Sequence, residues 1–270
     1  MTNHYNRRGM LKSQQQKSVE WGDFEEPPVP TNFIRLSIEG PEKQGKTTTA
    51  LSAPGPIAYI DLDFRGNRAI EAARSEGKVI KYLPIATPRN VGDLDAKTAA
   101  AQFRDIWNSK FVKNFKLACE LATQGLIRTT IIDTVTDLWE LELLSIFGRT
   151  DKVQPRDRSV PNNEFSNIIR HARKYPMNLI LISKVKEEWV NDKPTGRLKR
   201  AGYSYLGSDV DNMVHVSFTP ETGAVIKVLL SGDNGSLNGQ VYTQEDWGPV
   251  GPFAYFAMQA IPGSTLEDWT

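Results

Sequence analysis

The sequence predicts an α/β fold, in which a mostly parallel sheet carries helices on both faces and an antiparallel hairpin extends it. Between residues 33 and 183, short apolar runs alternate with longer runs of helical periodicity, the pattern of β-α-β units in a parallel sheet. Two apolar runs at 213–218 and 224–230 then flank Pro220-Glu221-Thr222-Gly223, a turn sequence typical of a hairpin.

Local signals place the elements in order along the chain. Gly77 ends an expected helix at Asn67–Ser75, and Gly125 ends a long amphipathic stretch at 96–124, because glycine readily adopts the conformation that follows a helix. The other expected helices are Lys46–Ala53, Asp137–Phe147 and Glu164–Lys174. The expected strands are Phe33–Glu39, Ile57–Asp61, Val79–Leu83, Thr129–Asp133, Asn178–Ser183, Met213–Phe218 and Ala224–Leu230.

Three regions follow from the composition along the chain. Residues 1–31 are polar, with a glutamine run and several prolines, and are expected to form a flexible N-terminal arm. Residues 32–231 hold the alternating elements and are expected to form the core, interrupted by a polar loop at 150–162 that contains two prolines. Residues 232–270 form a C-terminal extension, rich in glycine and proline, with a weak helix signal at Phe253–Ala260.

Composition restricts the classes of partner and compartment. The chain has 270 residues, 39% of them hydrophobic, and 33 basic against 32 acidic residues, so nucleic-acid binding needs a local cationic patch rather than bulk charge. Cys119 is the only cysteine, which rules out an intrachain disulfide and fits a reducing cytosol. No apolar run approaches the roughly 18 residues of a membrane span. We therefore expect a cytoplasmic protein with no membrane partner, in the host cytosol if a phage encodes it.

The most informative motif is Gly40-Pro41-Glu42-Lys43-Gln44-Gly45-Lys46-Thr47, which matches the phosphate-binding P-loop pattern and lies between an expected strand and an expected helix. Glycines let successive N–H groups point at phosphate oxygens, and the helix N-terminus adds positive potential. Lys46 would reach the β- and γ-phosphates, and the Thr47 hydroxyl would bind Mg²⁺. The alternative is a glycine-rich turn before a helix. The motif predicts ATP and Mg²⁺ as ligands and Gly40, Pro41, Glu42, Lys43, Gln44, Gly45, Lys46, Thr47 and Thr48 as the nucleotide-binding residues.

Acidic and basic residues at the ends of three expected strands would complete such a site, since ligands bind at the carboxyl ends of strands in open α/β sheets. Asp133 would hold Mg²⁺ with Thr47, or would only cap the next helix. One of Asp61 and Asp63 would face the γ-phosphate, or each would be a solvated turn acid. Lys184 would sense the γ-phosphate, or would be a solvated lysine at a strand end.

The most basic part of the sequence follows the strand that ends near Lys184. Cations there would follow a phosphate backbone and interleaved aromatics would stack on unpaired bases, and Gly196 and Gly202 would keep the segment mobile. The alternative is a solvated loop. The candidate nucleic-acid contacts are Lys186, Lys193, Arg197, Lys199, Arg200 and Tyr203, with Arg156 and Arg158 in the 150–162 loop.

From Phe33 to Leu230, this order of motifs resembles the RecA-type ATPase core. It is most similar to the short RecA-like single-strand annealing ATPases of bacteriophages. The resemblance implies that Asp63 is the catalytic carboxylate, where RecA has Glu, and that Asp133 ends the Walker B strand. It also places Lys184 where the family has a polar sensor, commonly Gln or His, and matches the 150–162 and 185–205 segments to two DNA-binding loops by position. Asp63, Lys46 and Lys184 are then the catalytic candidates.

One departure from that family concerns residues donated by a neighbouring subunit. RecA-type filaments complete the site with basic residues on the last hairpin strand, where this sequence offers only Lys227. Arg197, Lys199 and Arg200 are alternative donors. The resemblance still implies a homo-oligomer, either a filament or a ring, and single-stranded DNA and a single-strand binding protein as partners.

Three functions remain open at the level of sequence. The first is an ATPase that binds single-stranded DNA and acts in phage or bacterial recombination or strand annealing. The second is a nucleotide-gated DNA-binding protein with negligible turnover, which the lysine at the sensor position favours. The third is a P-loop kinase for a small acceptor, with the Arg197–Arg200 segment as its lid.

Overall fold

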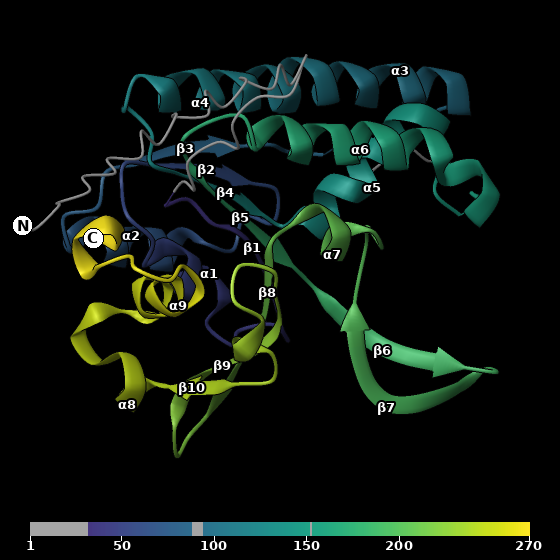
Figure 1. Cartoon of the computed structure of the whole chain (residues 1–270). Helices are drawn as coiled ribbons and strands as arrows, with labels where there is room; N and C mark the ends of the chain where they lie inside the picture. The colour runs from purple at the N-terminus through teal and green to yellow at the C-terminus, as the bar shows by residue number, and fades with distance from the viewer. Residues whose placement is uncertain (1–31, 88–93, 152) are drawn as a thin grey trace, which may run out of the picture. The chain divides into compact units, whose positions relative to one another are not determined.

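A single eight-stranded sheet forms the centre of the described structure (Figure 1). The computed structural model describes residues 32–87, 94–151 and 153–270, so the expected N-terminal arm lies outside the described residues. The strand order across the sheet is β10-β9-β8-β1-β5-β4-β2-β3. The bounds are β1 Arg35–Glu39, β2 Ile57–Asp61, β3 Ile80–Pro84, β4 Thr129–Asp133, β5 Asn178–Ser183, β8 Asn212–Thr219, β9 Gly223–Ser231 and β10 Val241–Thr243.

The pairing confirms the predicted fold class. From β8 through β3 every neighbouring pair is parallel, whereas β9 and β10 are added antiparallel at one edge. Strands β1, β4 and β5 are buried along their whole length, as expected for parallel strands covered on both faces. Because these strands are parallel, the carboxyl ends of β1, β2, β4 and β5 lie at the same end of the sheet.

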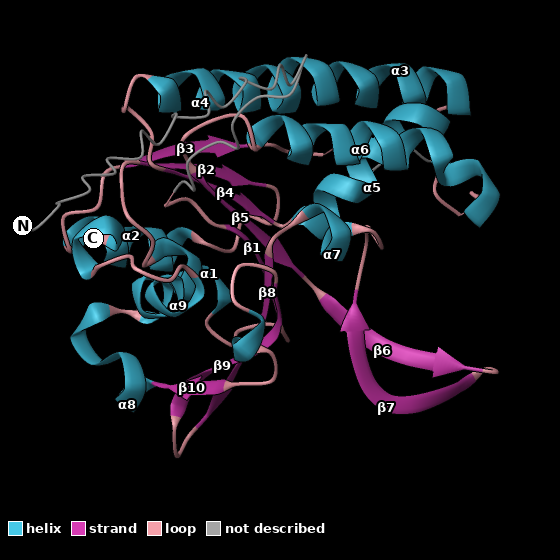
Figure 2. Cartoon of the chain, viewed as in Figure 1, coloured by secondary structure: helices cyan, strands magenta, loops and turns pink. Residues whose placement is uncertain are grey.

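Helices cover both faces of the sheet (Figure 2). One core contains residues of α1, α2 and α9, and the other contains residues of the long α3–α4 rod, α5, α6 and α7. A π-helical segment at Trp107–Val112 joins α3 to α4 without a break. The bounds are α1 Lys46–Leu51, α2 Asn67–Ser75, α3 Ala96–Ile106, α4 Lys113–Thr123, α5 Val135–Phe147, α6 Ser159–Ala172, α7 Leu206–Asp209, α8 Gln244–Trp247 and α9 Pro252–Ala260.

The segment 232–270 packs into the same core as the residues before it. Phe253 of α9 and Trp269 are buried in the cluster that contains α1, and their rings lie 6.1 Å apart. The backbone N–H of Phe253 donates to Ser52 Oγ at 3.1 Å. The expected helix at 253–260 is present, whereas β10 and α8 have no counterpart in the sequence-based expectation.

The prediction of a loop at 150–162 is wrong for the second half of that range. Pro155–Arg158 form a 3₁₀ turn and α6 begins at Ser159, five residues before the expected start at Glu164. Pro161 therefore lies in the first turn of a helix. Proline is tolerated there because the N–H groups of the first turn have no acceptor within the helix.

The basic segment after β5, predicted as a loop, is a hairpin. Strands β6 Val185–Val190 and β7 Lys193–Arg200 pair antiparallel as a separate two-stranded sheet, which extends away from the central sheet (Figure 1). Asn191 and Asp192 both have positive φ, 51° and 58°, as a two-residue type I′ turn requires.

A buried acid connects the helices on one face of the sheet. The side chain of Glu142 on α5 is fully buried, and Ser145 Oγ donates to its Oε2 at 3.1 Å. Burial, reinforced by a hydrogen bond with Glu164, raises the pKa of Glu142 to about 8. Arg104 in turn donates to Glu164 at 2.8 Å, so α3, α5 and α6 meet at this cluster.

This cluster predicts a pH-dependent stability. Glu142 ionises near pH 4.5 when exposed and near pH 8 when folded, so the unfolded chain loses its proton first and the free energy of unfolding falls as pH rises between these values. Urea denaturation at pH 5, 6.5 and 8 should show this loss, and Glu142→Gln should weaken it. The exposed Glu140→Gln on the same helix is the control, and an equal slope in both variants would contradict the assignment.

Candidate nucleotide site

The loop between β1 and α1 has the conformation of a phosphate cradle. Gly45 lies at φ 88° immediately before the first residue of α1, Lys46, so its N–H can turn toward a ligand as only glycine does readily. A Cβ at Gly40 would collide with the carbonyl oxygen of Val216 on β8. Both glycines of the motif are thus required by the backbone path, and the helix N-terminus faces the cradle.

Lys46 lies inside this loop. Its side chain is 9% exposed, and Nζ donates to the carbonyl oxygens of Gly40 and Pro41 at 2.8 and 2.5 Å. Burial lowers the pKa of this ammonium, although the nearby carboxylate of Asp133 acts in the opposite direction. A partly desolvated cation held only by neutral carbonyls is a strong electrostatic partner for phosphate oxygens.

Thr47 and Asp133 meet as a magnesium site requires. Thr47 Oγ1 donates to Asp133 Oδ2 at 2.8 Å, although the two residues come from α1 and the end of β4. The hydroxyl of Tyr59 on β2 donates to the same oxygen at 2.5 Å. Burial raises the pKa of Asp133, whereas a divalent cation would favour its charged form. A hydroxyl and a carboxylate beside a phosphate cradle are the oxygen ligands that Mg²⁺ accepts, so the residues present fit MgATP.

Asp61 and Asp63 are only two residues apart, but their side chains have different surroundings. Asp61 is fully buried, and its carboxylate accepts from the N–H groups of Asp63 and Phe64 at 3.0 and 2.8 Å and from Tyr82 at 2.9 Å. Asp63 instead lines the cavity beside the P-loop. Asp61 therefore holds the turn, and Asp63 is the acid of this pair that a bound nucleotide would meet.

Lys184 reaches the same place from the end of β5. Its Nζ lies 3.3 Å from Asp63 Oδ1 and 2.8 Å from Asp137 Oδ2. Burial acts to lower the pKa of Lys184, but the hydrogen bond and charge of Asp137 together with the charge of Asp63 raise it above its ordinary value. Lys184 is thus a charged lysine placed between two carboxylates, not a solvated residue at a strand end.

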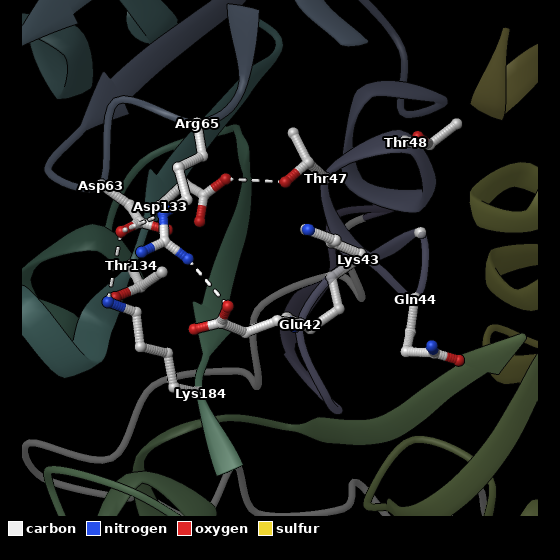
Figure 3. A pocket seen from close by; sticks show the side chains of 12 residues that line it. Glu42, Lys43, Gln44, Thr47, Thr48, Asp63, Arg65, Asp133, Thr134 and Lys184 are labelled. Atoms are coloured by element: carbon white, nitrogen blue, oxygen red, sulfur yellow. Dashed lines mark hydrogen bonds and ion pairs between the residues drawn. The ribbon is translucent and has the colours of Figure 1, made fainter. Parts of the chain in front are cut away.

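These groups surround one cavity of about 580 Å³, seen from close by in Figure 3. P-loop residues form one wall and the ends of β2, β4 and β5 form the other. Arg65 also lines it and forms an ion pair with Glu42 across the opening, at 2.8 Å. The lining residues are Glu42, Lys43, Gln44, Gly45, Lys46, Thr47, Thr48, Asp63, Arg65, Asp133, Thr134 and Lys184.

Most of the predicted nucleotide-binding residues line this cavity, and Gly40 and Pro41 instead provide the carbonyl acceptors for Lys46. Gln44 also has a structural contact, because its side-chain oxygen accepts from the N–H of Phe218 at 2.6 Å. Four residues at or beside the cavity were missed by sequence reasoning: Tyr59, Arg65, Thr134 and Asp137. Arg65 could have been found from the sequence, because it lies two residues after Asp63 in the turn that follows β2.

The predicted nucleic-acid residues are mostly on the β6–β7 hairpin. Lys186, Lys193, Arg197 and Lys199 are exposed there. Arg200 is half-buried, and its Nη1 approaches Met213 Sδ at 3.7 Å. The prediction that Tyr203 contacts nucleic acid is wrong. Tyr203 is 2% exposed, and its ring centroid lies 4.7 Å from that of Phe165. A buried ring cannot stack on a base.

Arg156 and Arg158 lie in the 3₁₀ turn before α6. Arg156 is exposed and lies 3.8 Å from Asp157, and Arg158 is half-buried. Neither lines the nucleotide cavity. Of these two arginines, Arg156 is the more exposed.

Comparison with known proteins supports the nucleotide site. A family model described as "AAA domain" matches residues 32–230, which span the sheet from β1 to β9 and include every residue of the cavity. No curated protein matches the chain. No helix among the described residues is long and apolar enough to cross a bilayer. Because the family model covers most of the chain and the P-loop geometry agrees with it, the chain belongs to the AAA domain family of P-loop nucleotide-binding ATPases.

Proposed function

We propose that the protein is an ATPase of the RecA-like kind that binds single-stranded DNA and acts in phage or bacterial recombination or strand annealing. In this proposal Lys46, Thr47 and Asp133 hold MgATP, and Asp63 orients the attacking water. The β6–β7 hairpin contacts the strand. Assembly into a filament or ring, and cooperation with a single-strand binding protein, belong to the same proposal.

The connection between the cavity and the hairpin carries this proposal. Lys184, which lines the cavity, is also the residue before β6. Its N–H donates to Thr136 Oγ1 at 3.0 Å, Thr136 Oγ1 donates to the carbonyl of Ala201 at 3.3 Å, and the N–H of Ala201 donates to the carbonyl of Lys184 at 2.8 Å. Both ends of the hairpin are thus fastened to the first turn of α5. A change in the Lys184 contacts would be transmitted to the hairpin.

Between residues 185 and 200 the hairpin carries five basic and three acidic side chains, and this excess of cations supports contact with a phosphate backbone. Lys186 on β6 and Lys199 on β7 are directly opposite each other, an arrangement that is unfavourable unless an anion lies between the two charges. Arg197 is two residues from Lys199 along β7. Trp189 is 56% exposed and provides an aromatic face for an unpaired base.

The proposal is tested by the salt dependence of binding to a labelled oligo-deoxythymidine, with an ATP analogue or ADP present. The double variant Lys186→Glu/Lys199→Glu should bind at least about tenfold more weakly, and its log–log salt slope should be shallower by about 1.4, since each phosphate contact on a single strand contributes about 0.7. Trp189→Ala should weaken binding without changing the slope, because stacking releases no counterions.

The matched control is Lys110→Glu/Lys113→Glu, which makes the same change in charge at exposed positions on the α3–α4 rod. Equal losses in the two double variants would indicate a nonspecific charge effect. No binding by the wild-type protein would contradict the proposed function.

A second function is favoured by one observation. Asp63 Oδ1 lies 3.3 Å from Lys184 Nζ and 3.6 Å from Arg65 Nε, so this oxygen is already occupied by two cations and is not free to orient a water molecule. A nucleotide-gated DNA-binding protein with negligible turnover would have this arrangement. DNA affinity that depends on the nucleotide, without measurable hydrolysis, would support it over the ATPase.

A further inference from the structure

Arg65 lies in a hydrogen-bonded turn at the opening of the nucleotide cavity. The buried carboxylate of Asp61 accepts from two successive N–H groups of this turn, and Phe64 adopts φ 58° just before Arg65. A Cβ at the next residue, Gly66, would collide with the hydroxyl of Tyr59. The turn therefore places Arg65 beside the P-loop, where its side chain pairs with Glu42.

The contacts of Arg65 are both with carboxylates of the site. Its Nη1 lies 2.8 Å from Glu42 Oε2 and its Nε lies 3.6 Å from Asp63 Oδ1 (Figure 3). The Arg65 and Glu42 side chains are each more than 60% exposed, so this pair contributes little to folding. Such a pair is readily exchanged for a stronger anion.

A triphosphate in this cavity would be that anion. A guanidinium binds two phosphate oxygens through two parallel N–H···O hydrogen bonds. This contact is stronger than the ion pair of Arg65 with an exposed carboxylate. Arg65 lines the same cavity as Lys46 and Thr47, and it also lines a neighbouring cavity that it shares with Lys184 and Asp63. Arg65 therefore lies on the same side of the cavity as Asp63.

In the part of the chain that the structure describes, the last hairpin strand, β9, places no cation at the cavity. Lys227 of β9 pairs with His215 and Val241, and it does not line the nucleotide cavity. Strand β9 is separated from β2 by β8, β1, β5 and β4. A cation for the γ-phosphate is thus available beside the site from the turn after β2.

We propose that Arg65 binds the γ-phosphate of a nucleotide held by the same chain, leaving Glu42 and Asp63 as it does so. Arg65 acts as an arginine finger in cis and frees Asp63 to orient water. This inference rests on the proposed ATPase function. It predicts that Arg65 distinguishes triphosphate from diphosphate, which can be measured by binding without turnover.

The first test measures the affinities of fluorescent ADP and a fluorescent non-hydrolysable ATP analogue. Arg65→Ala should reduce the preference for the triphosphate by about tenfold or more, as expected for loss of a charged hydrogen bond, with little change for ADP. Arg65→Lys should recover only part of the preference for the triphosphate, because lysine lacks the planar guanidinium that donates two parallel hydrogen bonds. Glu42→Gln should shift the preference in the opposite direction, since it removes a competitor for Arg65.

Arg68→Ala is the matched control, because Arg68 is exposed on α2, three residues away, and does not line the cavity. An unchanged preference in Arg65→Ala, with wild-type nucleotide binding intact, would overturn this inference alone. Failure of the wild-type protein to bind nucleotide would instead overturn the proposed function.

A mixing experiment separates action in cis from action in trans. Arg65→Ala and Lys46→Ala chains are combined and ATP hydrolysis is followed against total protein concentration. If Arg65 acts within its own chain, the mixture has no more activity than the sum of the two variants. Recovery of activity on mixing would show that Arg65 serves a neighbouring subunit and would overturn the assignment in cis.

Discussion

Lys46→Ala is expected to reduce ATP hydrolysis to below about 1% of the wild-type rate and to weaken nucleotide binding, because removal of one preorganised charge at a transferring phosphoryl group slows reactions by about 10² to 10³. The ammonium is buried and is held by the carbonyls of Gly40 and Pro41. Those acceptors are neutral, so they do not neutralise its charge. The effect should therefore appear in both substrate affinity and turnover.

The measurement is steady-state phosphate release over a range of ATP concentrations, with and without single-stranded DNA. Lys46→Met separates loss of charge from loss of volume, since methionine fills most of the space that lysine occupies. The fold should survive in both variants, because burial lowers the pKa of Lys46 and so opposes its charged form. Lys81→Ala, at an exposed lysine on β3, should behave as wild type. Substantial hydrolysis by Lys46→Ala would exclude the P-loop as the site.

The buried part of the fold could be predicted from sequence because its signals are local. Strands β2, β4 and β5 and helix α2 have the expected bounds, since each is a short apolar or amphipathic run that ends at a clear boundary. Gly77, at φ 91°, follows α2 as expected. For these elements, burial and local conformational preference favour the same structure.

The β6–β7 hairpin was missed because it has no buried face to impose an alternating pattern. Trp189, Val190 and Leu198 are all more than half exposed, so hydrophobic periodicity carries no information there. Its signal was the turn at Asn191-Asp192, which is weaker than Asn-Gly. The prediction for Tyr203 was wrong for the opposite reason. Tertiary packing buries this aromatic residue, although it follows a run of cations in the sequence.

The site was predictable where one motif contains it and unpredictable where distant segments form it. Lys46 and Thr47 are fixed by a continuous pattern. The ion pair of Arg65 with Glu42 joins residues 23 positions apart, and that of Lys184 with Asp137 joins α5 to the end of β5. These pairs depend on the strand order, which places β1, β5, β4 and β2 side by side.

Asp63→Asn is expected to lower the turnover number by about 10² or more while nucleotide affinity stays within a few-fold of wild type. A positioned base contributes about 10² to 10⁴ to catalysis, and asparagine keeps the shape of the side chain but cannot accept a proton. Asp63 lines the cavity, whereas Lys46 and Thr47 hold the nucleotide in the proposal. Turnover and binding should therefore separate in this variant.

Asp61→Asn is the matched comparison, because it makes the same chemical change two residues earlier. Asp61 is fully buried and accepts three hydrogen bonds, so its replacement should lower the midpoint of thermal unfolding. Asp63→Asn should leave that midpoint nearly unchanged. Asp63→Glu tests the role further, since it restores a carboxylate and should recover part of the turnover. Equal turnover in Asp63→Asn and wild type would remove Asp63 from the mechanism. It would leave Lys184 and Arg65 as cations whose carboxylate partner has only a structural role, and the nucleotide-gated binder would then be the better account of the site.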